Sequence, residues 1–358
     1  MSETMPARQL PVPRPRWQSF VPWIVVIVIL AIIPQILDEL WVTRVTGWIP
    51  LAIAALGLNL LTGYNGQISV GHGALYGLGA YAGALLVNAY DGQYLLGIVT
   101  AAVVCFVAGV LIGLPALRIK GLYLALVTLA VATMFPDLIK QFEGVTGGSQ
   151  GLQITSPQPY RGTFVEQTLE WKAPGWTGLA DDQWRFYVFA VIAVLCFWAV
   201  RNLVHSRIGR SLVAIRDNET AAEVNGVAVA RVKVITFGLS SALAGIGGAL
   251  FALLRMQVSP SSFTIAASLF FLIAVVIGGP ATVIGPAIGA VLYGFFDDVV
   301  TKELLPERFK PATPLILGIT LIVLMLTVPG GIMGVYSKFT ARRRFRAGQT
   351  PMPDPANP

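Results

Sequence analysis

Residues 201–233 read RNLVHSRIGRSLVAIRDNETAAEVNGVAVARVK and lie between two strongly apolar runs. Within this basic, polar segment, Leu212, Ile215 and the small pair Ala221-Ala222 are spaced to line one side of short helices. The rest of the chain is predicted to span a membrane or to connect spans. This segment is therefore the one with enough polar residues, in a helical pattern, to meet a water-soluble partner.

The ends of a short helix are marked within the same segment. Asp217 or Asn218 can cap a helix that begins at Glu219, and Gly226 suits its C-terminal end. The sequence thus predicts an exposed, partly apolar helix, carried between two spans, that can transmit motion from a soluble partner to the membrane helices. The alternative is an interfacial helix that lies on anionic lipid.

Composition places the chain in a membrane. Of its 358 residues, 55% are hydrophobic and 12% are charged, and the mean hydropathy is +0.71. An ordinary soluble domain carries about 25% charged residues, so this chain cannot cover a soluble surface. The net charge of +7 sits in short loops and the tail, where topology signals belong, and does not suggest nucleic acid. Cys105 and Cys196 lie inside apolar runs and imply neither a disulfide nor a metal site.

The apolar runs predict an all-α, polytopic membrane protein. A spanning helix needs roughly 17–25 apolar residues, and about ten runs approach that length, several of them interrupted by glycine or proline. The predicted spans are 20–37, 48–62, 68–90, 95–117, 122–139, 185–200, 234–254, 265–279, 283–298 and 314–328.

The placement of lysine and arginine predicts the orientation, because cytoplasmic loops carry the excess of these residues. Basic groups gather in an N-terminal arm (1–19), in residues 201–233 and in a tail (331–358). Both termini and the central segment are therefore predicted to be cytoplasmic. Arg118 and Lys120 mark a tight turn on the same side.

Residues 20–330 are predicted to form a single membrane domain. Within it, the long loop 143–184 falls on the external side, and its acidic residues outnumber its basic ones, as an exported loop allows. The tail ends in TPMPDPANP (350–358), whose proline content predicts partial disorder.

Two glycine-rich breaks interrupt the apolar runs. Residues 63–73 read GYNGQISVGHG, and residues 278–286 read GGPATVIGP. Broken backbone at membrane depth is tolerated only where it is buried in protein or lines a water-filled path, and breaks in both halves of a transporter point to its substrate path. A simple cytoplasmic turn is the alternative for the second break. The candidate path-lining residues are Gly66, Gln67, Gly71, His72, Gly73, Thr128, Gly278 and Gly279.

His72 is one of only two histidines in the chain. We interpret it as a polar group that a neighbouring carbonyl satisfies, with a proton relay as the alternative. No acidic residue lies in the middle of a predicted span, although ion-coupled carriers place one there at a cost of about 2.5–3.5 kcal/mol. The energy for transport is therefore expected to come from elsewhere.

Six stretches carry a resemblance to a known family. They are GYNGQISVGHGALYGLGAYAGALL (63–86), LRIKGLYLALVTLA (117–130), TGGSQGL (146–152), SRIGRSLVAIRDNETAAEVNGV (206–227), ITFGLSSALAGIGGALFA (235–252) and VVIGGPATVIGPAIGA (275–290). In this order they resemble the permease subunits of ABC importers, in particular the LivM-like family of branched-chain amino acid permeases.

The resemblance implies partners and a location. It implies a homologous second permease, two cytoplasmic ATP-binding subunits and an extracytoplasmic solute-binding protein, around a subunit embedded in the lipid of a bacterial inner membrane. It also implies a coupling loop that docks in an ATPase groove, formed by Arg207, Gly209, Arg210, Arg216, Asp217, Glu219, Ala221, Ala222 and Gly226. The general importer pattern EAA-x3-G is matched at the two alanines and the last glycine, but Thr220 stands where that pattern has glutamate, and Glu219 comes one residue early.

The expected role is transport rather than catalysis. The chain has no G-x-x-x-x-G-K-[ST] loop, so ATP is expected to bind to partner subunits, with no cofactor in this chain. We expect branched-chain or other neutral amino acids to cross by alternating access, driven by ATPase closure that pulls the coupling helices. The alternatives are the same importer type for urea, amides or a sugar, and a stand-alone channel or facilitator whose central segment only binds lipid.

Overall fold

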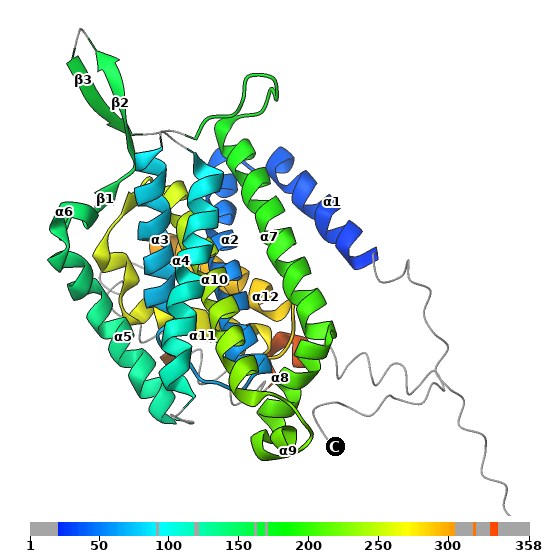
Figure 1. Cartoon of the computed structure of the whole chain (residues 1–358). Coiled ribbons are helices and arrows are strands. Elements are labelled where there is room, and N and C mark those ends of the chain that lie inside the picture. Colours follow the sequence, from blue (N-terminus) through cyan, green and yellow to red (C-terminus); the bar gives the residue numbers. More distant parts are fainter. Residues whose placement is uncertain are drawn as a thin grey trace, which may run out of the picture.

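The described part of the chain is a bundle of helices, with short strands at one end and two short helices at the other (Figure 1). The computed structural model describes residues 21–90, 93–117, 122–160, 163–168, 171–304, 318–319 and 330–335. The predicted arm, the turn at Arg118 and Lys120, nearly all of the span 314–328 and most of the tail lie outside the described residues.

Each of the first nine predicted spans overlaps a helix in the described residues, so the all-α, polytopic prediction is confirmed. These helices are α1 (Val21–Ile36), α2 (Glu39–Asn59), α3 (His72–Ala89), α4 (Tyr94–Ala116), α5 (Leu122–Gln141), α7 (Asp181–His205), α10 (Val229–Arg255), α11 (Ile265–Gly278) and α12 (Gly285–Phe295). Among the described residues, five helical segments are long and apolar enough to cross a membrane alone, namely Glu39–Tyr64, Tyr94–Pro115, Tyr123–Gln141, Asp181–His205 and Val229–Arg255.

The prediction was wrong at the start of α2, which begins at Glu39 rather than near residue 48. Arg44 interrupts the apolar run there, but it forms an ion pair with Glu303 on the π-helix η4 (Phe296–Leu304) that continues α12. Trp48 Nε1 donates to Asp298 Oδ2 of the same π-helix at 2.7 Å. Polar groups in the first turns of α2 are therefore paired within the bundle, and the helix extends beyond its apolar run.

Small residues bring α10 to the centre of the bundle, against α2, α3 and α4. A Cβ added at Gly79 on α3 would overlap Gly245 on α10, and one at Gly109 on α4 would overlap Ser241. A Cβ at Gly83 would lie 2.9 Å from the Cβ of Ala249. The helix backbones thus approach closely, as small residues allow in membrane bundles.

Strands occur where the sequence predicted only an external loop. Residues 143–184 contain α6 (Glu143–Thr146), β1 (Leu152–Gln153), β2 (Thr155–Tyr160) and β3 (Thr163–Thr168). The last two form an antiparallel hairpin, and β1 pairs with β4 (Gln257–Val258), just beyond α10. This end of the bundle lies opposite α8 and α9 (Figure 1). That arrangement agrees with the prediction that residues 143–184 and 201–233 lie on opposite sides of the membrane. Which end faces the cytoplasm stays a prediction.

The segment that joins α7 to α10 is shorter than the loop of residues 201–233 that the sequence predicted. Arg201–His205 is the last turn of α7, and Val229–Lys233 is the first turn of α10. Between them lie α8 (Arg207–Asp217) and α9 (Glu219–Val224). The apolar runs stop earlier than these helices because charged residues are tolerated where a helix leaves the apolar region.

Both predicted breaks are present. The first consists of a π-helical turn, η2 (Leu60–Tyr64), and irregular backbone up to Gly71, after which α3 begins at His72. The second separates α11 from α12, with Gly279 at φ +113° in a region that favours glycine. Helix α11 has 14 residues, too few to cross a membrane alone, and the short 3-10 helix η3 (Pro260–Phe263) precedes it.

Candidate coupling element and translocation path

The helices α8 and α9, here called the coupling element, are each started by a side-chain cap. Ser206 Oγ accepts from Ile208 N at 3.1 Å, and Asn218 Oδ1 accepts from Ala221 N at 2.9 Å. Of the two predicted caps for α9, Asn218 is therefore the one used. Gly226 follows α9 at φ +83°, a left-handed conformation that ends helices readily.

The inner face of the coupling element packs on the bundle through small and apolar residues. Leu212, Ile215 and Ala222 are buried. A Cβ added at Gly209 would overlap the carbonyl of Val204, so glycine is what lets α8 turn tightly under the end of α7. The prediction that Ala221 and Ala222 line the same side of a helix was wrong, because Ala221 is exposed whereas Ala222 is buried.

The outer face of the coupling element combines cations with apolar side chains. Its exposed residues include Arg207, Ile208, Arg210, Ala221 and Val224, and Gly226 is exposed in the turn that follows α9. An exposed face of this composition can contact a soluble protein or a lipid surface, so the face alone does not decide between the two.

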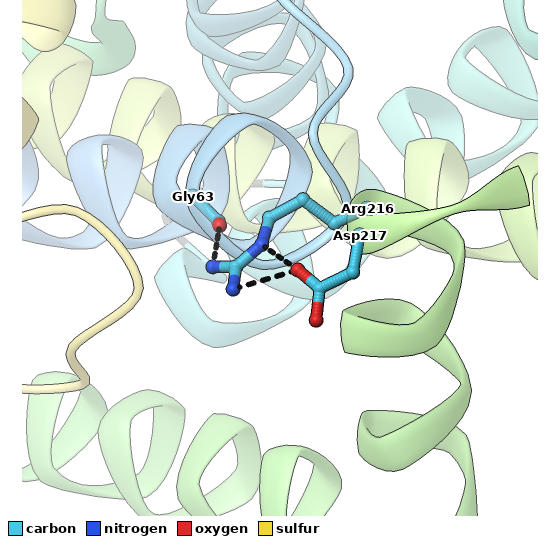
Figure 2. Close-up of polar contacts among 3 residues, drawn as sticks. All are labelled: Gly63, Arg216 and Asp217. Atoms are coloured by element: carbon cyan, nitrogen blue, oxygen red, sulfur yellow. Dashed lines mark hydrogen bonds and ion pairs between the residues drawn. The ribbon is translucent and has the colours of Figure 1, made fainter. Parts of the chain in front are cut away.

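Arg216 joins the coupling element to the first break (Figure 2). Its Nη1 donates to the carbonyl of Gly63 at 3.1 Å, and its Nε and Nη2 donate to Asp217 Oδ1 at 3.2 and 3.1 Å. A Cβ added at Gly66 would lie 2.8 Å from Arg216 Cγ, so this glycine, at φ +72°, makes room for the arginine stem. A charge-assisted hydrogen bond therefore joins the end of α8 to the end of η2.

A second polar link ties the coupling element to α10. Lys233 Nζ lies 2.8 Å from Glu219 Oε2, and the lysine side chain is only 10% exposed. Ion pairs shielded from water are less screened by salt than surface pairs. Together with the Arg216 bond, this pair connects α8 and α9 to two different helices of the bundle.

Asn59 joins the first break to the second. Its Nδ2 donates to the carbonyl of Thr282 at 2.7 Å, and its Oδ1 accepts from Ala281 N at 2.9 Å. The Asn59 side chain is fully buried at the last residue of α2. The Thr282 carbonyl and the Ala281 N–H of the second break are thus both hydrogen-bonded to the helix that leads into the first break.

Four of the predicted path residues come together where α3 begins, namely Thr128, Gly71, Gly73 and His72. Val70 N donates to Thr128 Oγ1 at 3.0 Å, and a Cβ at Gly71 would overlap the Thr128 backbone. Gly73 N donates to Ser268 Oγ on α11 at 2.9 Å. The fourth, His72, is the first residue of α3. Three segments therefore meet around the N-terminus of this helix.

His72 is fully buried, and its Nε2 lies 3.0 Å from the carbonyl of Ala54. The prediction that a carbonyl satisfies this histidine is therefore confirmed for one ring nitrogen. Gln67 Oε1 accepts from Asn65 Nδ2 at 2.9 Å, within the first break. Gly278 packs against Gly285 in the second break, and Gly279 packs against Met333. Apart from Gly66, the predicted path residues are buried, so they are enclosed by protein in this conformation.

An apolar cavity of about 570 Å³ lies between α1, α2, α7 and α12. Thr282, Val283 and Ile284 of the second break line it, with Arg201 and His205 from the end of α7. Most of the remaining lining is aliphatic or aromatic, which does not suit a zwitterionic solute.

Asn59 and Ser268 were not singled out from the sequence. Both are polar side chains within apolar runs, and a polar residue inside a membrane span is a functional candidate by default. That signal marks the residue, but it does not identify the partner.

The long apolar helices of the described residues define a multi-pass membrane protein. The chain belongs to the family described as branched-chain amino acid transport system, permease component, whose match covers residues 42–327. The high-affinity branched-chain amino acid transport system permease protein LivM of Salmonella typhimurium is 33% identical over 293 residues, which cover 78% of this chain and 67% of the relative. LivM of Escherichia coli shows the same identity and coverage, and the predicted LivM-like resemblance is confirmed.

A second group of relatives carries the name LivH. The high-affinity branched-chain amino acid transport system permease protein LivH of Escherichia coli is 26% identical over 291 residues, which cover 79% of this chain and 91% of the relative. No solved structure matches the chain.

Proposed function

We propose that this chain is the LivM-like permease subunit of an ATP-driven importer of branched-chain or other neutral amino acids. It pairs with a homologous second permease, two cytoplasmic ATP-binding subunits dock on α8 and α9, and an extracytoplasmic solute-binding protein delivers substrate at the opposite end. The Arg216 bond to Gly63 carries the proposal, because it links the docking element to the broken span. Similarity to relatives named LivM and LivH supports the amino acid substrate and the permease pair.

Transmission follows the hydrogen bonds of the described residues. ATP-driven closure of the partner subunits moves α8, and Arg216 passes that movement to the end of η2. A hydrogen bond from a charged group contributes about 1.5–3 kcal/mol, enough to keep the two segments moving together. Asn59 extends the connection to the second break, so that both breaks respond to one displacement.

A facilitator remains the second candidate, because the exposed Ile208 and Val224 on the coupling element also suit a lipid surface. The same importer type could also carry urea, amides or a sugar, since substrate choice rests largely with the binding protein. Uptake that requires ATP and co-purified ATPases distinguishes the importer from the facilitator. Uptake competition among leucine, urea and sugars distinguishes the substrates.

Separate variants test docking and transmission. In R207E/R210E, two exposed cations are reversed, and we expect loss of co-purified ATP-binding subunits and of uptake. R216Q keeps the outer face and removes the charge-assisted bond to Gly63, so we expect retained co-purification and uptake reduced about tenfold or more. R185E, at the other end of α7, is the control for docking and should leave co-purification of the ATP-binding subunits unchanged. Intact assembly and uptake in R207E/R210E would rule out docking at α8 and α9.

Sidedness is tested with two cysteines of equal exposure. Trp176 in the predicted external loop and Val224 on α9 are both 84% exposed. A membrane-impermeant maleimide added to intact cells should label W176C and leave V224C unlabelled until the membrane is opened. The native Cys105 and Cys196 are buried and serve as the background. The reverse pattern would invert the proposed orientation.

A further inference from the structure

Buried polar atoms without partners cluster beside the start of α3. Within the described part of the chain, five buried side-chain nitrogen or oxygen atoms have no hydrogen-bond partner, and four of them belong to Asn65, Ser69, His72 and Tyr76. The fifth, Trp184 Nε1, lies far away in sequence. Leaving such groups unpaired is costly, and native proteins contain few of them, so a cluster requires an explanation.

His72 and Tyr76 are one helical turn apart and share a face of α3. His72 Nε2 contacts the Ala54 carbonyl, which can only accept, so the proton is on Nε2 and Nδ1 of the neutral ring is an acceptor. The Tyr76 hydroxyl has no acceptor among the described residues and is available as a donor. One face thus presents an acceptor suited to an ammonium group and a donor suited to a carboxylate.

Aromatic rings enclose this face. The Phe271 ring on α11 lies 6.0 Å from the His72 ring and 5.1 Å from the Tyr76 ring, centroid to centroid. Phe251 and Phe263 lie 5.6 and 6.0 Å from Tyr76. These rings offer an apolar surface to an aliphatic side chain beside the two polar atoms.

We propose that His72 and Tyr76 form a solute-contact site within the permease for a zwitterionic amino acid with an apolar side chain, and that Phe271 covers this site in the conformation described. The proposal rests on the function proposed above. The His72 Nδ1 accepts from the substrate ammonium, the Tyr76 hydroxyl donates to its carboxylate, and the rings contact its side chain.

Helix α11 is the element whose displacement uncovers the site. It is short, it begins after η3, and it ends at the irregular backbone of the second break. Ser268 Oγ of α11 accepts from Gly73 N, next to His72. Displacement of α11 therefore moves Phe271 away from the two polar groups and opens the start of α3 at the same time.

The test uses Y76F in the complete transporter, co-expressed with its native partner proteins, and Y81F as a matched control. Tyr81 lies on the same helix, is also buried and also contacts Phe263, but its hydroxyl donates to the Val258 carbonyl at 3.4 Å. The measurements are uptake of radiolabelled leucine, ATP hydrolysis stimulated by the loaded binding protein, and thermal unfolding of the purified complex.

We expect Y76F to unfold at the same temperature or higher, because a buried hydroxyl without a partner has been removed. Its leucine uptake should fall about tenfold or more, the loss expected when a bond to a charged group disappears, while stimulated ATP hydrolysis remains. Y81F should keep uptake within about twofold of the wild type, since its hydroxyl already has a partner in the protein.

Uptake in Y76F equal to that of the wild type would overturn the site and leave the proposed function standing. An equal loss in Y76F and Y81F would also overturn it, because general disturbance of α3 would then explain both. Absence of ATP-dependent leucine uptake by the wild-type complex would instead overturn the proposed function, and with it the substrate assigned to this site.

Discussion

Asn59 joins the two breaks, and its replacement by leucine measures that connection. Leucine has a similar volume but makes no hydrogen bond, so Ala281 N and the Thr282 carbonyl both lose their partner. An unpaired buried polar group costs about 1–3 kcal/mol. Two such groups, if fully buried, would together cost about 2–6 kcal/mol. Because the two backbone groups here are only partly buried, we expect N59L to lower the free energy of unfolding by about 2–4 kcal/mol.

Asn88 provides a matched control. Its Nδ2 donates to the Gln153 carbonyl at 2.9 Å and its Oδ1 accepts from Thr155 N at 3.1 Å, the same pair of bonds at a partly exposed residue. Water can replace the lost partners there, so N88L should cost less than about 1 kcal/mol.

Thermal unfolding of the purified protein in detergent measures both variants. We expect the Tm to fall by about 5–10 °C in N59L and by less than about 3 °C in N88L. Leucine uptake should fall in N59L even at temperatures where it stays folded, because the second break no longer follows the first. Equal Tm shifts in the two variants, or normal uptake in N59L, would refute the reasoning.

Two further predictions concern packing and capping. G79L should lower Tm strongly, because a side chain at this position overlaps Gly245. G144L is the control and should be tolerated, because nothing lies within 4 Å of a Cβ added at Gly144. Similar thermal unfolding of both variants would contradict the close α3–α10 contact. N218A removes the cap of α9 and should cost about 1 kcal/mol, seen as faster hydrogen exchange at 219–224, while N218D keeps the acceptor and should exchange like the wild type.

Local sequence determined the fold class and the positions of the main irregularities. Long apolar runs with few charges form membrane helices because only helices or closed barrels satisfy their backbone groups in lipid. The glycine-rich stretches at 63–73 and 278–286 were predicted as breaks and are breaks, since glycine and proline weaken a helix wherever they gather. The start of α9 was also predicted, with Asp217 or Asn218 as its cap, because a cap depends on neighbours three residues away.

Tertiary structure alone decided which of these features meet. Arg216 and Gly63 are 153 residues apart, and Asn59 reaches a segment more than 220 residues further on. Helical periodicity identifies an apolar face but not the helix that covers it, so Ala221 was assigned to the wrong face, and the unpartnered atoms around His72 and Tyr76 were not foreseen. The physical reason is that hydrogen bonding and burial depend on neighbours in space, and membrane packing brings those neighbours from distant parts of the chain.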